Sequence, residues 1–591
     1  MLEQAAKAAL DQIDSLPSWL GFQRASRDVK SASLEDISKL AEAKVIEVGD
    51  LVPAYAYVFH NTLAQKLVRD QPLLLQASGL RLEAVRERFV RFDQQLIELN
   101  RQAAAVLTSQ PVVPAGVSSD PVGQPTELAL IEQEIAKKKR NIPIRQLIGR
   151  AGAALQALKP CFMMGPLSVA QYLAPGHLKF DLVVMDEASQ IKPEEALGAI
   201  ARGSQLVVAG DPQQLPPSSF FERQFDQDLD EDSAEDTSAV EEHESVLDVA
   251  TALYQPIRQL RWHYRSRHPG LIAFSNVEFY RSRLVLFPSP ADSGGQQCVQ
   301  FRHVANGVYE SGHAKWNRPE AERVIGLVLH HMHESPELSL GVVALNHQQR
   351  ELIEELLTDR LRNDEIAQLF IERHKETAEP FFVKTLENVQ GDERDVIVIS
   401  VTYGRDQNGN LSRRFGPINQ AQGPRRLNVL LTRAKHRVVV FSSIDPDEIR
   451  TDASSPRGVI VLKAYLNRAK NGRLKTESFS ELQPTSDLEI AVSNAITARG
   501  FECVPHVGVA GFFIDVAVRH PEKPGVFILG VVCDGASYHS VKSARDRDRL
   551  RPMILENLGW NIHRIWSTDW FRDSRREIEK VVERVRAEVL R

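Results

Sequence analysis

The fold is decided by two stretches of the sequence, Phe180-Asp-Leu-Val-Val-Met-Asp-Glu-Ala-Ser189 and Gln205-Leu-Val-Val-Ala-Gly-Asp-Pro-Gln-Gln-Leu-Pro-Pro217. In each of them a short apolar run, residues 182–185 and residues 206–209, ends in a group of polar residues. Short apolar runs of this kind are typical of strands buried on both faces of a parallel sheet. Ligands of such sheets bind beyond the carboxyl ends of the strands, so we expect the polar groups to lie at a binding edge.

The polar residues after these two runs suit nucleotide chemistry. Asp186 is placed to hold Mg²⁺ through water, and Glu187 beside it to orient or deprotonate an attacking water. One acid pair alone would fit equally well two core strands that end in solvated loops. Two such strand ends, separated by one helix-sized segment and with Gln213-Gln214 on the second, favour a nucleotide site.

Length, charge and cysteine content set the broad class of the protein. The 591 residues predict three or four domains, and the net charge of −6 gives no global basic field, although a local basic channel for nucleic acid remains compatible with it. The four cysteines are scattered without metal-type spacing, which indicates a reducing cytosol. No apolar run is long enough to span a bilayer and the start lacks a signal-peptide core, so we expect a cytoplasmic protein without membrane contact.

Composition and periodicity divide the chain into seven segments. We expect a helical arm or insertion (1–110), a linker (111–128), a first α/β unit (129–222), a solvated acidic insert (223–245), a second α/β unit with its own parallel sheet (246–444), a polar connector (445–484) and a small α/β domain (485–591).

Three arginines, Arg265, Arg426 and Arg433, lie next to expected strands and helices of the second unit. An arginine at a domain interface stabilises phosphoryl-transfer charge and is worth about three to five orders of magnitude in rate. Each arginine alone, however, is more typical of a surface or salt-bridge residue.

The last segment contains two aspartates in strand-like runs, Asp515 and Asp534. Neighbouring strand positions would give them a metal-binding geometry. Four arginines follow at alternate positions, Arg545, Arg547, Arg549 and Arg551, and form a positive segment suited to phosphates. The alternative is a small α/β domain with a salt-bridged helix.

Five motifs in order resemble those of superfamily 1 helicases, in the class that includes the RNA-surveillance and Okazaki-fragment-processing helicases. They are Asp186-Glu-Ala-Ser (motif II, Walker B), Gly210-Asp-Pro-Gln-Gln-Leu-Pro-Pro (motif III), His263-Tyr-Arg-Ser-Arg-His-Pro (motif IV), Gln390-Gly-Asp-Glu-Arg-Asp (motif V) and Arg426-Leu-Asn-Val-Leu-Leu-Thr-Arg-Ala (motif VI). The resemblance covers roughly residues 142–443. It implies two RecA-like parallel-sheet domains, the first of them incomplete, that use ATP and Mg²⁺ and act on nucleic acid.

The same resemblance implies roles for individual residues. Asp186 would bind Mg²⁺, Glu187 would be the catalytic base and Gln214 would sense the γ-phosphate. Arg265 and Arg433 would be arginine fingers. Gln390, Gly391 and Glu393 would bind on the nucleotide side and couple it to strand movement.

The last segment, over about residues 487–572, is similar to the very-short-patch-repair-like endonucleases of the PD-(D/E)XK superfamily. The matching stretches are Asp534-Gly-Ala-Ser-Tyr-His539, Ser543-Ala-Arg-Asp-Arg-Asp-Arg549 and Gly559-Trp-Asn-Ile-His-Arg-Ile-Trp-Ser-Thr-Asp-Trp570. This implies a restriction-endonuclease-like α/β domain in which Glu489, Asp515 and Asp534 form an acidic cluster. Asp515 and Asp534 would bind Mg²⁺ or Mn²⁺, and His539 would assist catalysis.

Two departures from these families matter. Val532 stands where the endonucleases have an acid two positions before Asp534, which removes a charged oxygen ligand for a metal. The 591 residues also contain no Gly-x-x-x-x-Gly-Lys-Ser/Thr loop, which in the helicases cradles the phosphates. We therefore expect the C-terminal part of a helicase–nuclease, either truncated or completed by a second chain that supplies the Walker A region.

The expected function is ATP hydrolysis coupled to strand translocation, joined to a metal-dependent DNA endonuclease-like domain, in bacterial DNA defence or repair. The endonuclease resemblance favours DNA over RNA. The alternative is a catalytically inactive protein that binds nucleic acid or serves as an interaction module.

Overall fold

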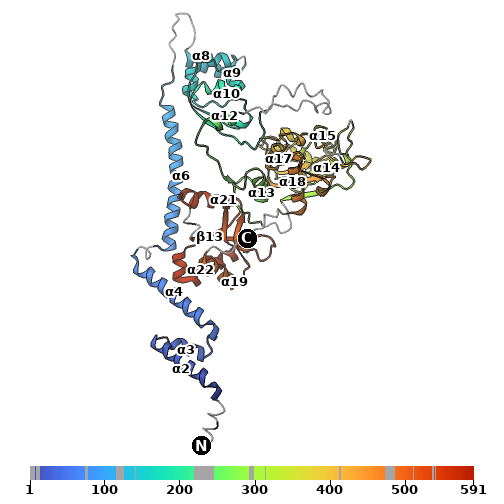
Figure 1. Cartoon of the computed structure of the whole chain (residues 1–591). Helices are drawn as coiled ribbons and strands as arrows, with labels where there is room; N and C mark the ends of the chain where they lie inside the picture. The colour runs from blue at the N-terminus through green and yellow to red at the C-terminus, as the bar shows by residue number, and fades with distance from the viewer. Residues whose placement is uncertain are drawn as a thin grey trace.

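A computed structural model of the chain shows a helical arm and three α/β units (Figure 1). It describes residues 7, 13–72, 77–114, 126–139, 141–217, 245–291, 298–312, 314–411, 414–472, 486–509, 511–535, 538 and 541–590. His539, most of the expected linker and nearly all of the expected acidic insert lie outside these residues.

The N-terminal arm is helical, as expected. It contains η1 (Ile13–Ser15), α2 (Leu16–Ser31), α3 (Glu35–Glu42), η2 (Val48–Asp50), α4 (Leu51–Asp70) and α6 (Gly79–Ser109). The side chain of Ser78 caps the start of α6 by accepting a hydrogen bond from the Arg81 amide. With 31 residues, α6 is about 46 Å long. It runs beside the C-terminal unit towards the first α/β unit (Figure 1).

The first α/β unit contains the two strands on which the sequence analysis began. Its elements are α7 (Glu127–Ala136), α8 (Ile144–Leu158), α9 (Pro166–Tyr172), β1 (Phe180–Met185), η3 (Ala188–Gln190), α10 (Pro193–Ile200), β2 (Gly203–Val208) and α12 (Val246–Leu253). The strands β1 and β2 pair in parallel, from Phe180 opposite Gly203 to Met185 opposite Val208. α12, which we expected to open the second unit, packs here instead, and its Val246 amide donates to Ile191 O at 2.9 Å.

The expectation that both faces of these strands are buried is wrong. Leu182, Val184 and Val207 are 48%, 60% and 49% exposed. The described part of this sheet has two strands, and apolar side chains that a wider, covered sheet would bury therefore face outward.

The second unit has the expected parallel sheet. Its strands, in spatial order, are β5 (Val299–His303), β9 (Ala434–Ser442), β8 (Arg394–Ser400), β6 (Leu340–Ala344) and β7 (Phe382–Thr385). Its helical elements are α13 (Gly270–Glu278), α14 (Arg318–Glu334), α15 (His347–Leu361), α16 (Glu365–Lys375), η6 (Leu386–Asn388), η7 (Gly416–Asn419), α17 (Gly423–Leu431), η8 (Pro446–Glu448) and α18 (Arg457–Asn471). Separate apolar cores cover the two faces of this sheet.

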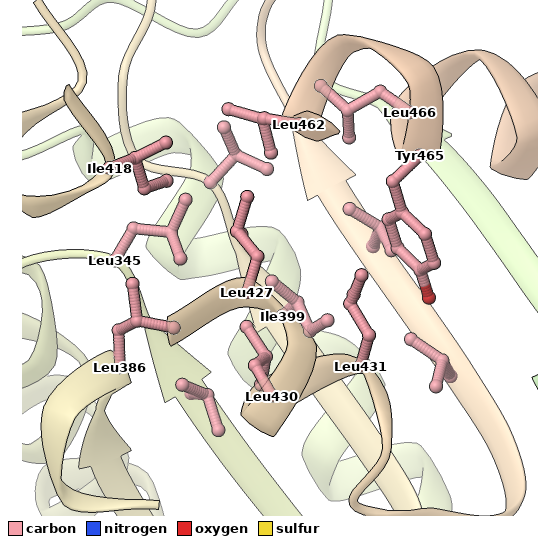
Figure 2. Packing of buried hydrophobic residues seen from close by; sticks show 14 of the residues in the cluster. Leu345, Leu386, Ile399, Ile418, Leu427, Leu430, Leu431, Leu462, Tyr465 and Leu466 are labelled. Carbon is pink, nitrogen blue, oxygen red and sulfur yellow. The ribbon is translucent and has the colours of Figure 1, made fainter. Parts of the chain in front are cut away.

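One of these cores holds α17, and with it motif VI, against the sheet. Figure 2 shows Leu427 and Leu430 of α17 beside Ile399 of β8, in the same cluster as Leu462 of α18. All four side chains are at most 3% exposed. Close packing of this kind fixes the helix in position, so the polar residues on its other side are presented from a rigid element.

The C-terminal unit is a small α/β domain, as expected, but its sheet has an unexpected composition. The spatial order of its strands is β13 (Ile562–Ile565), β12 (Phe527–Cys533), β11 (Phe512–Arg519), β10 (Cys503–Val509), β4 (Val285–Leu286) and β3 (Trp262–His263). The helical elements are α19 (Asp487–Thr497), η9 (Arg545–Leu550), α21 (Arg551–Asn557) and α22 (Ser567–Val589).

The strands β3 and β4 come from the sequence that we assigned to the second unit. They join the C-terminal sheet through the pairing of Leu286 with Val509. The Trp560 indole also donates to Pro288 O at 2.8 Å. The C-terminal unit is therefore tied by main-chain pairing to the segment that carries motif IV.

Replacing Leu430 with alanine should lower the free energy of unfolding of the second unit by about 2–5 kcal/mol. The shorter side chain leaves a cavity, and the closely packed core around it cannot collapse to fill that cavity. Urea denaturation followed by tryptophan fluorescence and circular dichroism measures this. Leu369→Ala, at a residue 69% exposed on α16, is the control and should change stability by less than about 0.5 kcal/mol. Equal effects of the two changes would contradict the described core.

Candidate functional site

The end of β1 carries the two acids of motif II. Glu187 has a left-handed backbone (φ +50°), which is uncommon for a residue other than glycine and is typical of functional sites. Its amide donates to Asp186 Oδ1 at 2.9 Å, and the next amide, of Ala188, donates to Ala209 O at the end of β2. Both acids are exposed. Their carboxylates thus lie open at the carboxyl edge of the first sheet, and Asp186 fits a water-bridged Mg²⁺.

Motif III meets the second unit through Asp211 and Gln214. Asp211 Oδ2 accepts hydrogen bonds from Tyr280 Oη at 2.7 Å and from Gln214 Nε2 at 3.3 Å. Gln390 Nε2 of motif V donates to Gln214 Oε1 at 3.2 Å. The expected γ-phosphate sensor therefore contacts the expected coupling residue directly.

Two further residues in this network had not been selected from the sequence. Asn428 Nδ2 donates to Gln213 O and to Tyr280 Oη, both at 3.0 Å. Burial, and then Asp211, raises the pKa of Tyr280, so its hydroxyl stays protonated and donates to the carboxylate. Asn428 lies within motif VI and could have been selected there. Tyr280 lies outside every motif, and no local pattern marks it.

The two expected arginine fingers lie on the same side of the second unit. Arg265 Nε pairs with Glu393 Oε2 at 2.7 Å. Arg433 is 5% exposed and donates to Val429 O at 2.8 Å. Burial, and then Arg265, lowers the pKa of Arg433, while Glu187 acts in the opposite direction. Arg433 is therefore within electrostatic range both of Arg265 and, across the two units, of Glu187.

The strand β3 fixes the loop that carries Arg265. His263 Nε2 accepts a hydrogen bond from the Ser266 amide at 3.3 Å and lies 2.9 Å from Ser266 Oγ. Burial, and then Arg265, lowers the pKa of His263 to about 4, so the ring is neutral near pH 7. A neutral ring at this place keeps the turn closed without adding a second positive charge beside the arginine.

The structure thus brings together most of the residues predicted for the nucleotide site: Glu187, Gln214, Arg265, Gln390, Glu393 and Arg433. Gly391, next to Gln390, has φ +84°, a backbone conformation that favours glycine. Arg426 pairs with Glu387 at 3.6 Å and donates to Pro417 O at 3.1 Å, both within the second unit.

The C-terminal unit brings three acids near one another at the end of β12. Asp515 Oδ2 accepts a hydrogen bond from the Cys533 amide at 2.7 Å. Burial, with a further contribution from Glu489, raises the pKa of Asp515 to about 7. Burial and then Asp515, Glu489 and Asp534 raise the pKa of the Cys533 thiol, which places all three carboxylates around one side chain.

Asp534 serves a structural purpose in this arrangement. Its Oδ1 accepts from the Ser567 amide at 2.6 Å and its Oδ2 accepts from Ser567 Oγ at 3.0 Å, so both oxygens hold the start of α22. The pairing of β11 with β12 ends at Val516 opposite Val531, and Asp515 and Val532 are the next residues on the two strands. The position of the missing acid therefore lies on the strand next to that of Asp515.

These residues fit a divalent metal poorly. Within the described ranges, no three His, Cys, Asp or Glu side chains are arranged to hold a metal ion. His539, the expected auxiliary residue, is outside those ranges, so its expected role stays a prediction.

Comparison with known protein families finds matches in three parts of the chain. Residues 167–220 and 240–445 match two families described as AAA domain (AAA_11 and AAA_12), and residues 488–585 match the family REase_MTES_1575. The chain joins helicase-type AAA domains to a C-terminal restriction-endonuclease-like domain. The resemblance to superfamily 1 helicases and the endonuclease-like nature of the last segment are thereby confirmed.

The relatives that the chain resembles in sequence are also named as helicases. The chain is 30% identical over 437 residues to the uncharacterized ATP-dependent helicase MG140 homolog of Mycoplasma pneumoniae, a match over 71% of this chain and 38% of the relative. It is 28% identical over 457 residues to MG140 of Mycoplasma genitalium, over 74% of this chain and 40% of the relative. It is 25% identical over 381 residues to the probable helicase MAGATAMA 3 of Arabidopsis thaliana, over 60% and 42%. The chain spans about two fifths of the length of these relatives.

Among solved structures, the chain is similar to that of the PRRSV helicase at 14% identity and a TM-score of 0.22, over 57% of this chain and 49% of that one. The family assignment rests on the sequence matches. Over the part of the chain that the structure describes, no helix combines the length and apolar character needed to cross a membrane.

Replacing Asp515 with asparagine should change how stability depends on pH. The folded state holds this proton up to about pH 7, whereas an unfolded aspartate releases it near about pH 4. The free energy of unfolding therefore falls as pH rises from about 4 to 7 and levels off above that. Asp515→Asn removes this decrease, which urea titrations at several pH values will detect. Glu522→Gln, an exposed change in the same unit, should keep the wild-type dependence, and a wild-type slope in Asp515→Asn would contradict the assignment.

Proposed function

We propose that the chain is the C-terminal part of a nucleic-acid-dependent helicase that hydrolyses ATP between its first and second α/β units to move along a strand. The observation that carries this proposal is the 3.2 Å hydrogen bond between Gln214 of motif III and Gln390 of motif V. A side chain that senses a phosphate in one unit thereby contacts the other unit, which is the link that coupling hydrolysis to movement requires.

Each residue of the interface has a role in this proposal. Mg²⁺ held by Asp186 would neutralise phosphate charge. Glu187 takes the proton of the attacking water, and Arg265 and Arg433 stabilise the charge that develops on the transferred phosphoryl group. Gln214 reports the state of the nucleotide to motif V, where Gln390, Gly391 and Glu393 change position with it.

A phosphate loop from outside these 591 residues completes the site, either in the same polypeptide or in a second chain. The sequence contains no Gly-x-x-x-x-Gly-Lys-Ser/Thr loop. The exposed apolar faces of Leu182, Val184 and Val207 support an additional segment that packs on this sheet. Such a segment would bring the main-chain amides and the lysine that hold the phosphates.

We further propose that the nucleic acid is DNA and that the protein works in the cytoplasm in bacterial DNA defence or repair. The support is the endonuclease-like domain, since helicase domains alone are compatible with DNA and RNA.

Residues 1–591 should turn over ATP slowly on their own and rapidly when a Walker A segment is supplied by fusion or in trans. In the completed protein, Glu187→Gln should lower DNA-stimulated turnover by about 10²–10⁴-fold, because the base is lost. A coupled phosphate-release assay measures this, with Glu195→Gln on the exposed face of α10 as the matched control. Rapid DNA-stimulated turnover by residues 1–591 alone would refute the proposed missing loop.

The second candidate function is that the endonuclease-like domain binds DNA without cutting it. Two observations favour it: Val532 stands where an acid is expected, on the strand next to that of Asp515, and both oxygens of Asp534 cap α22. Under this candidate the domain positions DNA for the helicase-type domains.

Changing Val532 to glutamate tests this candidate directly. The Val532 side chain is half-buried, and the new carboxylate would lie on the strand next to that of Asp515. Val532→Glu should gain Mn²⁺-dependent nicking of supercoiled plasmid, whereas the wild type and Val532→Gln, which has the same size without the charge, should leave the plasmid intact. Efficient metal-dependent cutting by the wild type that Asp515→Ala abolishes would instead establish an active nuclease.

A further inference from the structure

The long helix α6 contacts the C-terminal unit at three residues spaced by seven, Gly79, Arg86 and Asp93. Seven residues are close to two helical turns, so all three lie on one face of α6 over about 21 Å. The Gly79 amide donates to Asp569 Oδ1 at 2.8 Å, and Arg86 Nη1 donates to Asp548 O at 2.9 Å. The face that the heptad spacing defines is therefore the docking face of the arm.

The third contact joins one carboxylate to two arginines. Asp93 Oδ1 accepts from Arg545 Nε at 2.9 Å and from Arg545 Nη2 at 2.6 Å, and Arg549 Nε lies 2.9 Å from Asp93 Oδ2. The Arg545 hydrogen bond, together with Arg549, lowers the pKa of Asp93, so the carboxylate is ionised throughout the neutral range. With 7% exposure, Asp93 fills the space between the two guanidinium groups.

The fully buried residues of α6, Gly79 and Asp93, make polar contacts in this docking. Among its apolar residues, Leu82, Phe89 and Val90 are half-buried, whereas Leu80, Phe92 and Leu99 are 84%, 61% and 60% exposed. Interfaces between domains that lack a large apolar core separate readily. None of the apolar residues of α6 is fully buried, so the contact lacks the large apolar core that would make it permanent.

The arginine segment that the sequence suggested for phosphates is divided by the structure into two sets. Arg547 pairs with the adjacent Asp548 at 2.8 Å, and Arg551 lies over the Phe512 ring at 5.2 Å. Arg545 and Arg549, by contrast, hold a group from the arm. They lie on η9, a π-helical turn, and such turns are rare and frequently occur at functional sites.

We propose that Arg545 and Arg549 form a binding site for the phosphodiester backbone of nucleic acid, and that Asp93 of the arm occupies this site as an internal competitor. Two converging guanidinium groups recognise paired anionic oxygens, which a carboxylate and a phosphodiester both present. Nucleic acid that binds η9 displaces α6, and a docked α6 excludes nucleic acid. This site rests on the DNA-binding role proposed above for the C-terminal domain.

Asp93→Asn tests the site in the full chain. Fluorescence anisotropy with a short labelled DNA duplex should show about tenfold tighter binding than the wild type at moderate salt, with a log–log salt slope steeper by about 2, because two arginines become available. Adding Arg545→Gln and Arg549→Gln to Asp93→Asn should abolish the gain. Equal affinities of the wild type and Asp93→Asn, or a gain that survives loss of both arginines, would overturn the proposal.

A second variant undocks the other end of α6. A Cβ at Gly79 would lie 2.3 Å from Asp569 Oδ2 and 2.8 Å from Trp566 Cδ1, so Gly79→Ala must displace Asp569 and break its hydrogen bond to the Gly79 amide. This variant should also bind DNA more tightly. Gly149→Ala in α8, where a Cβ meets no atom within 4 Å, is the matched control and should bind as the wild type does. A gain in Gly149→Ala equal to that in Gly79→Ala would argue against undocking.

The outcomes of these experiments distinguish failure of the competitor site from failure of the proposed function. Unchanged affinity in the Asp93 and Gly79 variants of a protein that hydrolyses ATP refutes the competitor site alone. Tighter binding in both variants, with no ATP hydrolysis even after a Walker A segment is supplied, upholds the site and refutes the proposed function. No DNA binding by any variant refutes the site.

Discussion

The candidate nucleotide site depends on the hydrogen bond from the Tyr280 hydroxyl to the Asp211 carboxylate, at 2.7 Å. Tyr280 is supplied by the second unit and Asp211 by motif III of the first. Burial and the neighbouring carboxylate keep the phenol protonated, so the bond has a charged acceptor in a poorly solvated place, where such bonds are strongest. Asn428 donates to the same hydroxyl and to Gln213 O, which adds motif VI to the contact. The position of Gln214, and with it its contact to Gln390, follows from this arrangement.

A second constraint connects the two candidate sites. β3 and β4 belong to the sheet of the endonuclease-like domain, and Arg265 follows β3 after one residue. Asp515 lies on β11, two strands from β4 in the same sheet. The loop with the proposed arginine finger therefore moves together with the endonuclease-like sheet unless the Leu286–Val509 pairing breaks. The arm touches this domain through α6 and the first unit through α8, so it joins the two ends of the assembly.

The sequence predicted those parts of the fold that are marked by a pattern within one short stretch of residues. The apolar runs before Asp186 and Gly210 gave β1 and β2, and the alternation of strands and helices gave the second parallel sheet. β3 and β4 have two residues each, too few for a periodic pattern, and their partner β10 is far along the chain. Their pairing was not predictable for that reason. The contact of Asp93 was not predictable either, because its two arginines are more than four hundred residues away along the chain. For Asp534 the sequence suggested a metal ligand, whereas in the structure its carboxylate holds the start of α22.

The central claim is that the Asp211–Tyr280 contact fixes the position of the first unit relative to the second. A double-mutant cycle with Asp211→Ala and Tyr280→Phe, measured by the free energy of unfolding of residues 1–591, tests it most directly. A part-buried hydrogen bond to a charged group predicts a coupling energy of about 1.5–3 kcal/mol between the two changes. Additive effects, with a coupling energy near zero, would contradict the account.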